Sequence, residues 1–559
     1  MHSTIPGRLP RLIPARASLM PVVSIFLVLA ALTTLWSLAS PIMAVPDEPA
    51  HAIKAAAVVR GQLQGQPSGK QGDPALVQVP QYFAELGLQV CYGFNPGKTA
   101  DCAPEVNADH RTPTPALTSA GNYNPVYYLA VGAPSRILSG APALYAMRIV
   151  SGLISAVFLT MAFAAARRMK NPQWPLIGCV VALTPMVLFL SGSINPNSLE
   201  IATTASLFLS LSVVLENTHN LSKVRGPLWA VGLSAAALAN TRALSLLWLA
   251  LAVLVAVMMF GWRPLWSAVK TRLGLAMTAL AGLGCALGLG WLLVADSFKS
   301  LGGIPSAVTP DQAFVTMLDR TFSYTEGYIG LMGWLDTPAP KGVQMLWHFA
   351  IAAVFLAGLT ARSRRSRWAL GLIVVSIVFL PAILQAQVIQ EIGYIWQGRY
   401  LLALIALLVI ASAVALRDRA FPVSVISRTA ARWALGAVVA AQFYAFIHTL
   451  RRYTVGIFAE HTNWSEMWDA AWQPPLGWPT LSAAYLITLT AGAVLIYRAL
   501  FRTVGSGPGM PTTALSPQQP VRAPAVARAE GATTTAAKVE TGRTVGVAVL
   551  DEGERRDAL

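Results

Sequence analysis

The sequence predicts an all-α membrane protein that crosses the bilayer many times. Of its 559 residues, 55% are hydrophobic and only 12% are charged, and the mean hydropathy is +0.55. A soluble globular chain carries about 25% charged residues, roughly twice as many. The apolar residues also form long uninterrupted blocks, whereas a spanning helix needs about 20 of them. These observations exclude a soluble domain, a disordered chain and a coiled-coil or collagen-like rod.

The apolar blocks predict about twelve transmembrane helices. Several blocks are short or are interrupted by Pro or Gly. Only Asn240-Thr241-Arg242 separates the fifth block from the sixth, so residues 227–260 form either one broken span or two short spans. The predicted spans lie near 19–40, 143–165, 174–193, 198–215, 227–241, 244–260, 273–294, 343–361, 368–388, 401–416, 433–450 and 479–497.

The positions of the charges predict the topology. The net charge is +16, but Lys and Arg stand in short patches at block ends, as in Arg167-Arg168, and form no continuous face for nucleic acid. With a cytoplasmic N-terminus, the inner connections are rich in cations and contain only two acids, Glu216 and Asp418. The positive-inside rule favours this arrangement. We therefore expect a plasma-membrane protein with both termini cytoplasmic.

This topology divides the chain into three regions. Residues 1–18 form a cytoplasmic N-terminus and residues 19–500 form the transmembrane domain. Residues 501–559 are rich in Gly, Pro, Ala and Thr without an apolar period, which predicts a disordered cytoplasmic tail. The large loops, at 41–142, 295–342 and 451–478, all lie outside, so we expect any chemistry to take place on the extracytoplasmic side.

Two of the four cysteines stand in the first outer loop. Cys91 and Cys102 lie in an oxidising compartment and are close enough in sequence to close a small ring. We predict a disulfide between them, with two free thiols as the alternative.

A cluster of ionisable residues follows the first span. Asp47 and Glu48 are adjacent, and His51 and Lys54 follow within two turns. In a helix that starts at Asp47, spacings of four and three residues place Asp47, His51 and Lys54 on one face. Asp47 would also suit the N-cap of such a helix. The cluster predicts a polar site at the outer membrane surface, and the two interpretations are compatible.

Other polar residues stand at the outer ends of later spans. Arg148 lies inside the second span, where a cation is costly unless it is paired or faces a wet cavity. Arg242 and Arg399 lie on the outer side, where topology does not require Arg. Arginine binds phosphate through two parallel hydrogen bonds, although an ion pair with an acid such as Glu391 explains them equally well. We predict substrate contacts from these residues and from His51, Lys54, Tyr123, Asn124, Asn195, Asn197, Asp336, Gln397 and Tyr400.

Four short motifs occur in order along the chain: Pro46-Asp47-Glu48-Pro49-Ala50-His51, Asn195-Pro196-Asn197, Gly333-Trp334-Leu335-Asp336-Thr337 and Gly398-Arg399-Tyr400. Together they resemble the signatures of domain-of-unknown-function family 2142, a family of bacterial polytopic membrane proteins. That family is similar in layout to the GT-C glycosyltransferases. The resemblance implies a GT-C-like architecture over 19–500, with Asp47 catalytic and Glu48 beside it. The family pattern has an acid after Asn195-Pro196, where this chain has Asn197.

The resemblance favours an enzyme. It implies a glycosyltransferase that moves a sugar from a polyprenyl-phosphate donor to an extracytoplasmic cell-envelope acceptor. The expected partners are the lipid bilayer, the lipid-linked sugar and a glycan acceptor. The sequence identifies no cofactor and leaves the need for a divalent metal open. Two alternatives also remain, a transporter or flippase of lipid-linked glycans and a non-enzymatic protein of envelope assembly.

Overall fold

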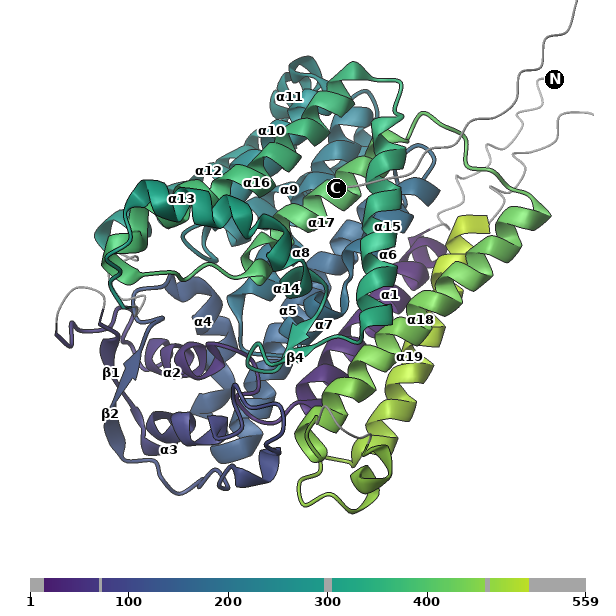
Figure 1. The fold of residues 1–559 in the computed structure, drawn as a ribbon. Coiled ribbons are helices and arrows are strands. Elements are labelled where there is room, and N and C mark those ends of the chain that lie inside the picture. The colour runs from purple at the N-terminus through teal and green to yellow at the C-terminus, as the bar shows by residue number, and fades with distance from the viewer. Residues whose placement is uncertain (1–14, 70–72, 296–303, 458–462, 502–559) are drawn as a thin grey trace, which may run out of the picture. The chain divides into compact units, whose positions relative to one another are not determined.

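Each predicted apolar block contains a helix in the structure, a computed structural model that describes residues 15–69, 73–295, 304–457 and 463–501 (Figure 1). Of the predicted N-terminal segment 1–18, residues 1–14 lie outside this described part. The predicted tail, 501–559, lies outside it from residue 502 onward. The following description concerns the described residues.

Nine helices in the described part are long and apolar enough to cross a membrane. Three of them, α1 (Ala15–Ala39), α18 (Val425–Thr454) and α19 (Trp478–Phe501), pack side by side along one edge of the bundle (Figure 1). Within α1 the apolar stretch is Met20–Ala39. The span that contains α17 also includes the 3-10 turn before it, η5 (Gly398–Leu401). The others are α5 (Gly140–Ala166), α8 (Pro196–Glu216), α12 (Arg272–Val294), α15 (Lys341–Leu359), α16 (Arg364–Ile392) and α17 (Leu402–Ala415).

Two bent helix pairs raise the number of described candidate spans to eleven. The axes of α6 (Gln173–Ala182) and α7 (Pro185–Ser191) differ by 67°, because Pro185 cannot continue the hydrogen bonding of the preceding helix. The axes of α10 (Ser245–Phe260) and α11 (Trp262–Val269) differ by 111°. The remaining block, predicted at 227–241, is α9 (Leu221–Ala239), whose first turns carry Lys223 and Arg225. Residues 227–260 thus form two helices.

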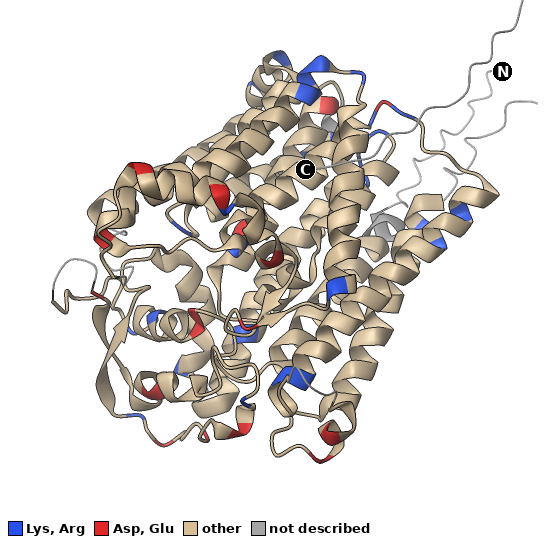
Figure 2. Cartoon of the chain, in the orientation of Figure 1, with Lys and Arg blue, Asp and Glu red and all other residues tan. Residues whose placement is uncertain are grey.

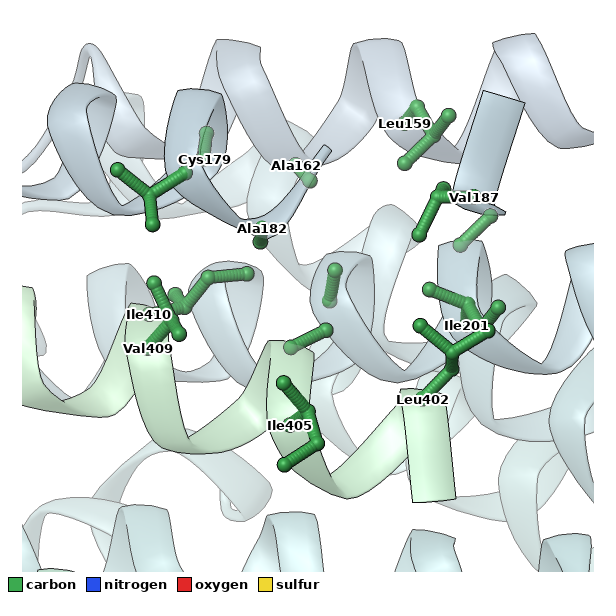
Figure 3. Packing of buried hydrophobic residues seen from close by; sticks show 14 of the residues in the cluster. Leu159, Ala162, Cys179, Ala182, Val187, Ile201, Leu402, Ile405, Val409 and Ile410 are labelled. Atoms are coloured by element: carbon green, nitrogen blue, oxygen red, sulfur yellow. The ribbon is translucent and has the colours of Figure 1, made fainter. Parts of the chain in front are cut away.

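Two helices occupy the centre of the bundle. All of the apolar window of α8 and 94% of that of α17 is buried, as expected for helices that are hydrophobic on every side. Figure 3 shows Ile201 of α8 and Ile405 and Ile410 of α17 in one buried cluster with Leu159 of α5 and Cys179 of α6. This core fixes the N-terminal ends of α8 and α17, next to which Asn195 and Arg399 lie.

The long segments between the spans contain short helices and two small sheets. In the first loop, β1 (Ala75–Pro80) pairs antiparallel with β2 (Pro113–Thr118), from Ala75 opposite Thr118 to Pro80 opposite Pro113. In the second loop, β3 (Leu331–Met332) pairs with β4 (Thr337–Pro338). The described short helices are α2 (Glu48–Val58), α3 (Gln81–Ala84), α4 (Pro125–Gly132), α13 (Pro310–Asp319) and α14 (Thr325–Ile329), with 3-10 turns at η1 (Glu85–Val90), η2 (Ala100–Cys102), η3 (Ala133–Arg136), η4 (Thr321–Tyr324) and η6 (Trp464–Asp469).

Charges divide between the two ends of the helices. Figure 2 shows Lys and Arg around α11 and along the connection before α18, whereas most Asp and Glu lie over the half that contains α2, α3, α13 and α14. This is the separation that the charge pattern of the sequence predicts. The fold is therefore that of a polytopic helical membrane protein.

Candidate functional site

Asp47 stands directly before α2 in a left-handed backbone conformation, with φ at 67°. Asp tolerates this region better than most residues. The helix begins at Glu48, one residue later than expected, and Asp47 holds the N-cap position without a side-chain capping bond. The carboxylate is therefore free to point elsewhere.

The Asp47 carboxylate pairs with the guanidinium of Arg399. Nη2 of Arg399 donates to Oδ2 of Asp47, and Nη1 donates to the carbonyl oxygen of Pro46 at 3.2 Å. Nδ2 of Asn195 donates to the same carbonyl at 3.4 Å. The side chain of Arg399 is 1% exposed, while that of Asp47 is 44% exposed. Arg399 thus binds the Pro46-Asp47 loop from the protein interior, and the Asp47 carboxylate stays accessible to solvent.

The local charges keep Asp47 ionised. Burial raises the pKa of this carboxyl, but the positive charges of Arg399 and Arg242 outweigh that effect and hold the pKa below its ordinary value. Asp47 is therefore a carboxylate at neutral pH.

Asp47 opens onto a polar cavity of about 430 Å³. Aromatic rings and amides make up half of its lining residues, and Asp47 is the sole carboxylate among the described residues that line it. Of the residues predicted from the sequence, the cavity brings together Asp47, His51, Tyr123, Asn197, Arg242, Gln397 and Tyr400.

Arg242 is the guanidinium that faces this cavity. It stands between α9 and α10, donates to Oδ1 of Asn197, and lies 4.9 Å from the centre of the Tyr400 ring. Its Nη1 is 3.5 Å from Oε2 of Glu200, whose other carboxylate oxygen accepts a 2.6 Å bond from Ser245. Arg242 is therefore held by three groups around it.

Glu200 is a site residue that our sequence analysis missed. It lies one turn after Asn197 on α8 and is buried. Residues three apart share a helix face, and a carboxylate within an apolar span is itself a signal of function. Glu200 supplies an acid near the position where the family pattern has one and this chain has Asn197.

His51 also lines the cavity, in its neutral form. Its Nδ1 lies 2.8 Å from the hydroxyl of Tyr128, and its ring lies 5.8 Å from that of Tyr123. Burial lowers the pKa of His51 to about 3, because the enclosed site disfavours the charged imidazolium. At neutral pH His51 is a polar contact without charge.

Glu48 faces away from the cavity, contrary to our expectation that it shares in catalysis. Its two oxygens accept bonds of 2.7 Å each from Nε and Nη2 of Arg148, and neither side chain is exposed to solvent. Arg148 also donates to the carbonyls of Ser37, Ser40 and Pro41 at the end of α1. The pair connects α2 to α1 and α5, and both side chains are fully buried.

Lys54, Asn124 and Asn195 support the site from outside the polar cavity. The Lys54 ammonium donates to the carbonyls of Leu63 and Gly121 at 2.6 Å each, and Lys54 is not among the residues that line the polar cavity. Asn124 donates to Oδ1 of Asn240 at 2.9 Å and caps α4. Asn195 caps α8 as well as holding the Pro46 carbonyl. All three thus make internal hydrogen bonds, and Asn124 also lines a second cavity beside the polar one.

Asp336 belongs to a second buried cluster. Its carboxylate accepts a 2.8 Å bond from Nη2 of Arg452, which also donates to the carbonyls of Tyr92, Asn95 and Lys98. Those carbonyls lie within the ring that the Cys91–Cys102 disulfide closes in the structure. The indole of Trp334 donates to the carbonyl of Met43, four residues before Asp47. Asp336 thus connects these loops and is not among the residues that line the cavity.

Within the described part of the chain, no three His, Cys, Asp or Glu side chains come together as a metal site. Asp47 already faces two guanidinium groups, and such a carboxylate attracts a divalent cation less than a free one does. We derive no step through a metal.

A second cavity, of about 390 Å³, adjoins the polar one. The two share Tyr123, Arg242, Trp396 and Tyr400 as part of a common wall. Beyond this wall the second cavity is lined mainly by apolar side chains of α10, α12 and α16, among them Leu246, Leu292, Leu384 and Val388. Arg242 therefore lies where the polar cavity adjoins the second, mainly apolar cavity.

The fold and the four motifs define an integral membrane protein of a recognisable family. Residues 30–408 match the model of the family described as "Predicted membrane protein (DUF2142)", and the chain belongs to that family. No curated protein matches the chain.

Among solved structures, the chain is similar to ArnT from Cupriavidus metallidurans, in a structure with undecaprenyl phosphate bound. The identity is 13%, the TM-score is 0.41, and the match covers 87% of this chain and 78% of that one. It is also similar to the arabinofuranosyltransferase AftD from Mycobacteria, at 18% identity and a TM-score of 0.39, over 78% of this chain and 27% of that one.

Proposed function

We propose that this protein is a membrane glycosyltransferase that moves a sugar from a polyprenyl-phosphate donor to a hydroxyl of an extracytoplasmic cell-envelope acceptor. One observation carries the proposal: the accessible carboxylate of Asp47 and the guanidinium of Arg242 line one polar cavity, and Arg242 also lines the apolar cavity next to it. A polyprenyl-phosphate sugar fits this arrangement, with its sugar in the polar cavity, its phosphate at Arg242 and its long apolar chain in the second cavity.

In this mechanism Asp47 is the general base. The acceptor hydroxyl attacks the anomeric carbon, its proton passes to the Asp47 carboxylate, and the bond between that carbon and the phosphate oxygen breaks. The lipid phosphate leaves with its electron pair. Arg242 stabilises the negative charge that develops on the phosphate, in a site where donors are fixed in advance.

The two arginines then have different roles, and their order differs from that expected from the sequence. We expected Arg399 to hold the donor phosphate, with Arg242 second. Arg399 is enclosed and its two terminal nitrogens already bond to the Pro46-Asp47 loop, so we assign it to positioning the base. Arg242 faces both cavities, and Asn197 and Glu200 hold it in place. It is the better phosphate ligand.

The proposal includes a topology. The cavity lies among the ends of helices on the side that the charge pattern assigns to the outside of the plasma membrane. Cysteines introduced at Arg111 and Arg320 should then react with an impermeant maleimide in intact cells, and one at His219 only after permeabilisation. Reaction of the first two only after permeabilisation would place the cavity on the cytoplasmic side.

Turnover tests the function directly. Proteoliposomes containing the purified protein and a panel of polyprenyl-phosphate sugars should release the free lipid phosphate when envelope glycan is added outside, and radiolabel should pass to the glycan. A transporter would instead move the intact donor between leaflets, which protection of the sugar from periodate reports. Movement of the donor without its consumption would replace the proposal with that alternative.

A further inference from the structure

The elbow between α10 and α11 lies at the end of the bundle opposite the cavity. Gly261 stands at the break with φ at 93°, a conformation that favours glycine, and the two helix axes differ by 111°. α11 combines aromatic and apolar residues such as Trp262 and Trp266 with polar ones such as Arg263, and Lys270 is its C-cap. A short amphipathic helix across the end of a spanning helix is typical of one that lies in the membrane interface.

A hollow of about 940 Å³ opens beside this elbow, between α10, α11 and the first turns of α16. Arg263 and Arg365 both line it, although they are about a hundred positions apart in the chain. A Cβ atom placed on Gly261 would lie 3.2 Å from Nη1 of Arg365, so this guanidinium rests against the backbone of the elbow. The hollow is therefore built by contacts between distant segments.

The lining combines cations, aromatic rings and an apolar wall. Trp262 and Trp368 are 60% and 70% exposed, although large aromatic side chains usually bury more of their surface. Val257 and Met258 continue the wall along α10. Among the described residues that line the hollow there is no Asp or Glu, so no carboxylate balances the two arginines.

The nearby acids are already engaged elsewhere. Glu216 accepts a hydrogen bond from the backbone N–H of Lys170, and Asp418 pairs with the Lys170 ammonium at 3.0 Å. Neither lines the hollow. Arg263 and Arg365 are exposed, and no hydrogen bond or ion pair to either is among those described.

We propose that this hollow binds the headgroup of an anionic phospholipid. The two guanidinium groups bind the phosphate, for which arginine has the matching fork of donors. The indole rings lie at headgroup level, where Trp is favoured, and the acyl chains follow the apolar wall of α10. The site is independent of the proposed transfer reaction and lies on the face rich in Lys and Arg. Acidic lipids attract such clusters in a membrane surface.

Native mass spectrometry of the full-length protein tests this site. The protein is purified with an equimolar mixture of phosphatidylglycerol and phosphatidylcholine, and the lipids that remain bound are counted. Wild type should retain phosphatidylglycerol preferentially. Arg263→Gln/Arg365→Gln should lower that preference by about fivefold for each charge removed. The matched control is Lys223→Gln/Arg225→Gln, which removes two exposed cations of α9 at the same end but outside the hollow.

The possible outcomes distinguish a specific lipid-binding site from general attraction of acidic lipids to the basic face. Retention of phosphatidylglycerol that is equal in wild type and Arg263→Gln/Arg365→Gln overturns the proposal. An equal loss in the α9 control also overturns it, because the whole basic face would then be responsible. Glycerol 3-phosphate should not displace the lipid, and displacement by this soluble headgroup would show a site for free phosphate instead. An unchanged melting temperature shows that each variant is folded.

Discussion

Arg399 donates a hydrogen bond to Asp47 across 352 positions of the chain, and the two side chains differ sharply in exposure: the arginine is 1% exposed and the carboxylate 44%. An ion pair between two exposed groups contributes little to stability. Here the enclosed partner also holds the preceding carbonyl, so the pair sets the direction of an accessible carboxylate. This geometry is suited to placing a base.

Arg399→Lys should therefore impair the chemical step more than substrate binding. Lysine keeps the charge but cannot bond to the Pro46 carbonyl and to Asp47 with a rigid fork. A base displaced by about 1 Å can cost about 100-fold in rate. We expect kcat to fall by about 10- to 100-fold, with KM for the donor nearly unchanged. Steady-state kinetics in proteoliposomes measure both, with the exposed Arg111→Lys as control. A large rise in KM alone would assign Arg399 to the donor instead.

Arg242→Lys should show the opposite pattern. Charge-assisted hydrogen bonds contribute about 1.5–3 kcal/mol each, so loss of one should weaken binding of undecaprenyl phosphate by about tenfold or more. This lipid serves as the probe because it joins one phosphate to a long apolar chain. Equilibrium binding in detergent, compared between wild type, Arg242→Lys and Arg399→Lys, gives the answer. Equal affinities for wild type and Arg242→Lys would remove Arg242 from the phosphate site.

The fold was largely predictable from the sequence, because long apolar blocks indicate membrane-spanning helices and cation patches indicate the ends of those helices. Each predicted block contains a helix, and the pairing of Cys91 with Cys102 in the structure follows the sequence expectation. The span count was less accurate, since bends at Pro185 and Gly261 depend on packing as well as on composition. α11 is an example of a helix whose direction the sequence did not predict, because the bend between α10 and α11 occurs at Gly261, which has a positive φ.

The site was predictable only in part, because its residues are paired over long distances. The motifs identified Asp47, but adjacent Asp47 and Glu48 are chemically alike in sequence. Only the fold shows that Arg148, 100 positions away, encloses Glu48. The sequence prediction omitted Glu200 because it relied on position 197 of the family motif. The carboxylate one turn into an apolar span was a signal that could have identified it. Asp336 lies in one of the four motifs, and in the structure its carboxylate pairs with Arg452, which connects the loops.

The Cys91–Cys102 disulfide should stabilise the outer loops. Closing a loop of sequence separation 11 stabilises by about 3 kcal/mol in the chain-entropy model. Its ring contains the carbonyls that Arg452 binds, so Cys91→Ser/Cys102→Ser should lower the melting temperature of the purified protein. Peptide mass spectrometry without reductant should find the two cysteines linked. Two free thiols in the mature protein would contradict the pairing.

His51 should make stability depend on pH. Burial holds its pKa at about 3, against 6.5 for an ordinary histidine. As the pH falls below 6.5, the unfolded chain binds a proton that the folded protein does not. The free energy of unfolding should then decrease by about 1.4 kcal/mol per pH unit from this group, down to its folded pKa. Above pH 6.5 the contribution is constant. Denaturant unfolding at several pH values should show a shallower slope for His51→Gln, and an identical slope would show that His51 is accessible and ordinary.

The central claim is that Asp47 is the catalytic base, and Asp47→Asn tests it most directly. The substitution keeps the side-chain volume and one acceptor oxygen for Arg399 but removes the group that takes the proton. Loss of a general base costs about 10²–10⁴ in rate. The measurement is kcat for sugar transfer from a polyprenyl-phosphate donor, with matched amounts of wild type, Asp47→Asn and the exposed outer-loop control Asp109→Asn in proteoliposomes. The account predicts a loss of at least about 100-fold for Asp47→Asn and none for the control. Turnover by Asp47→Asn within a few-fold of wild type would contradict it.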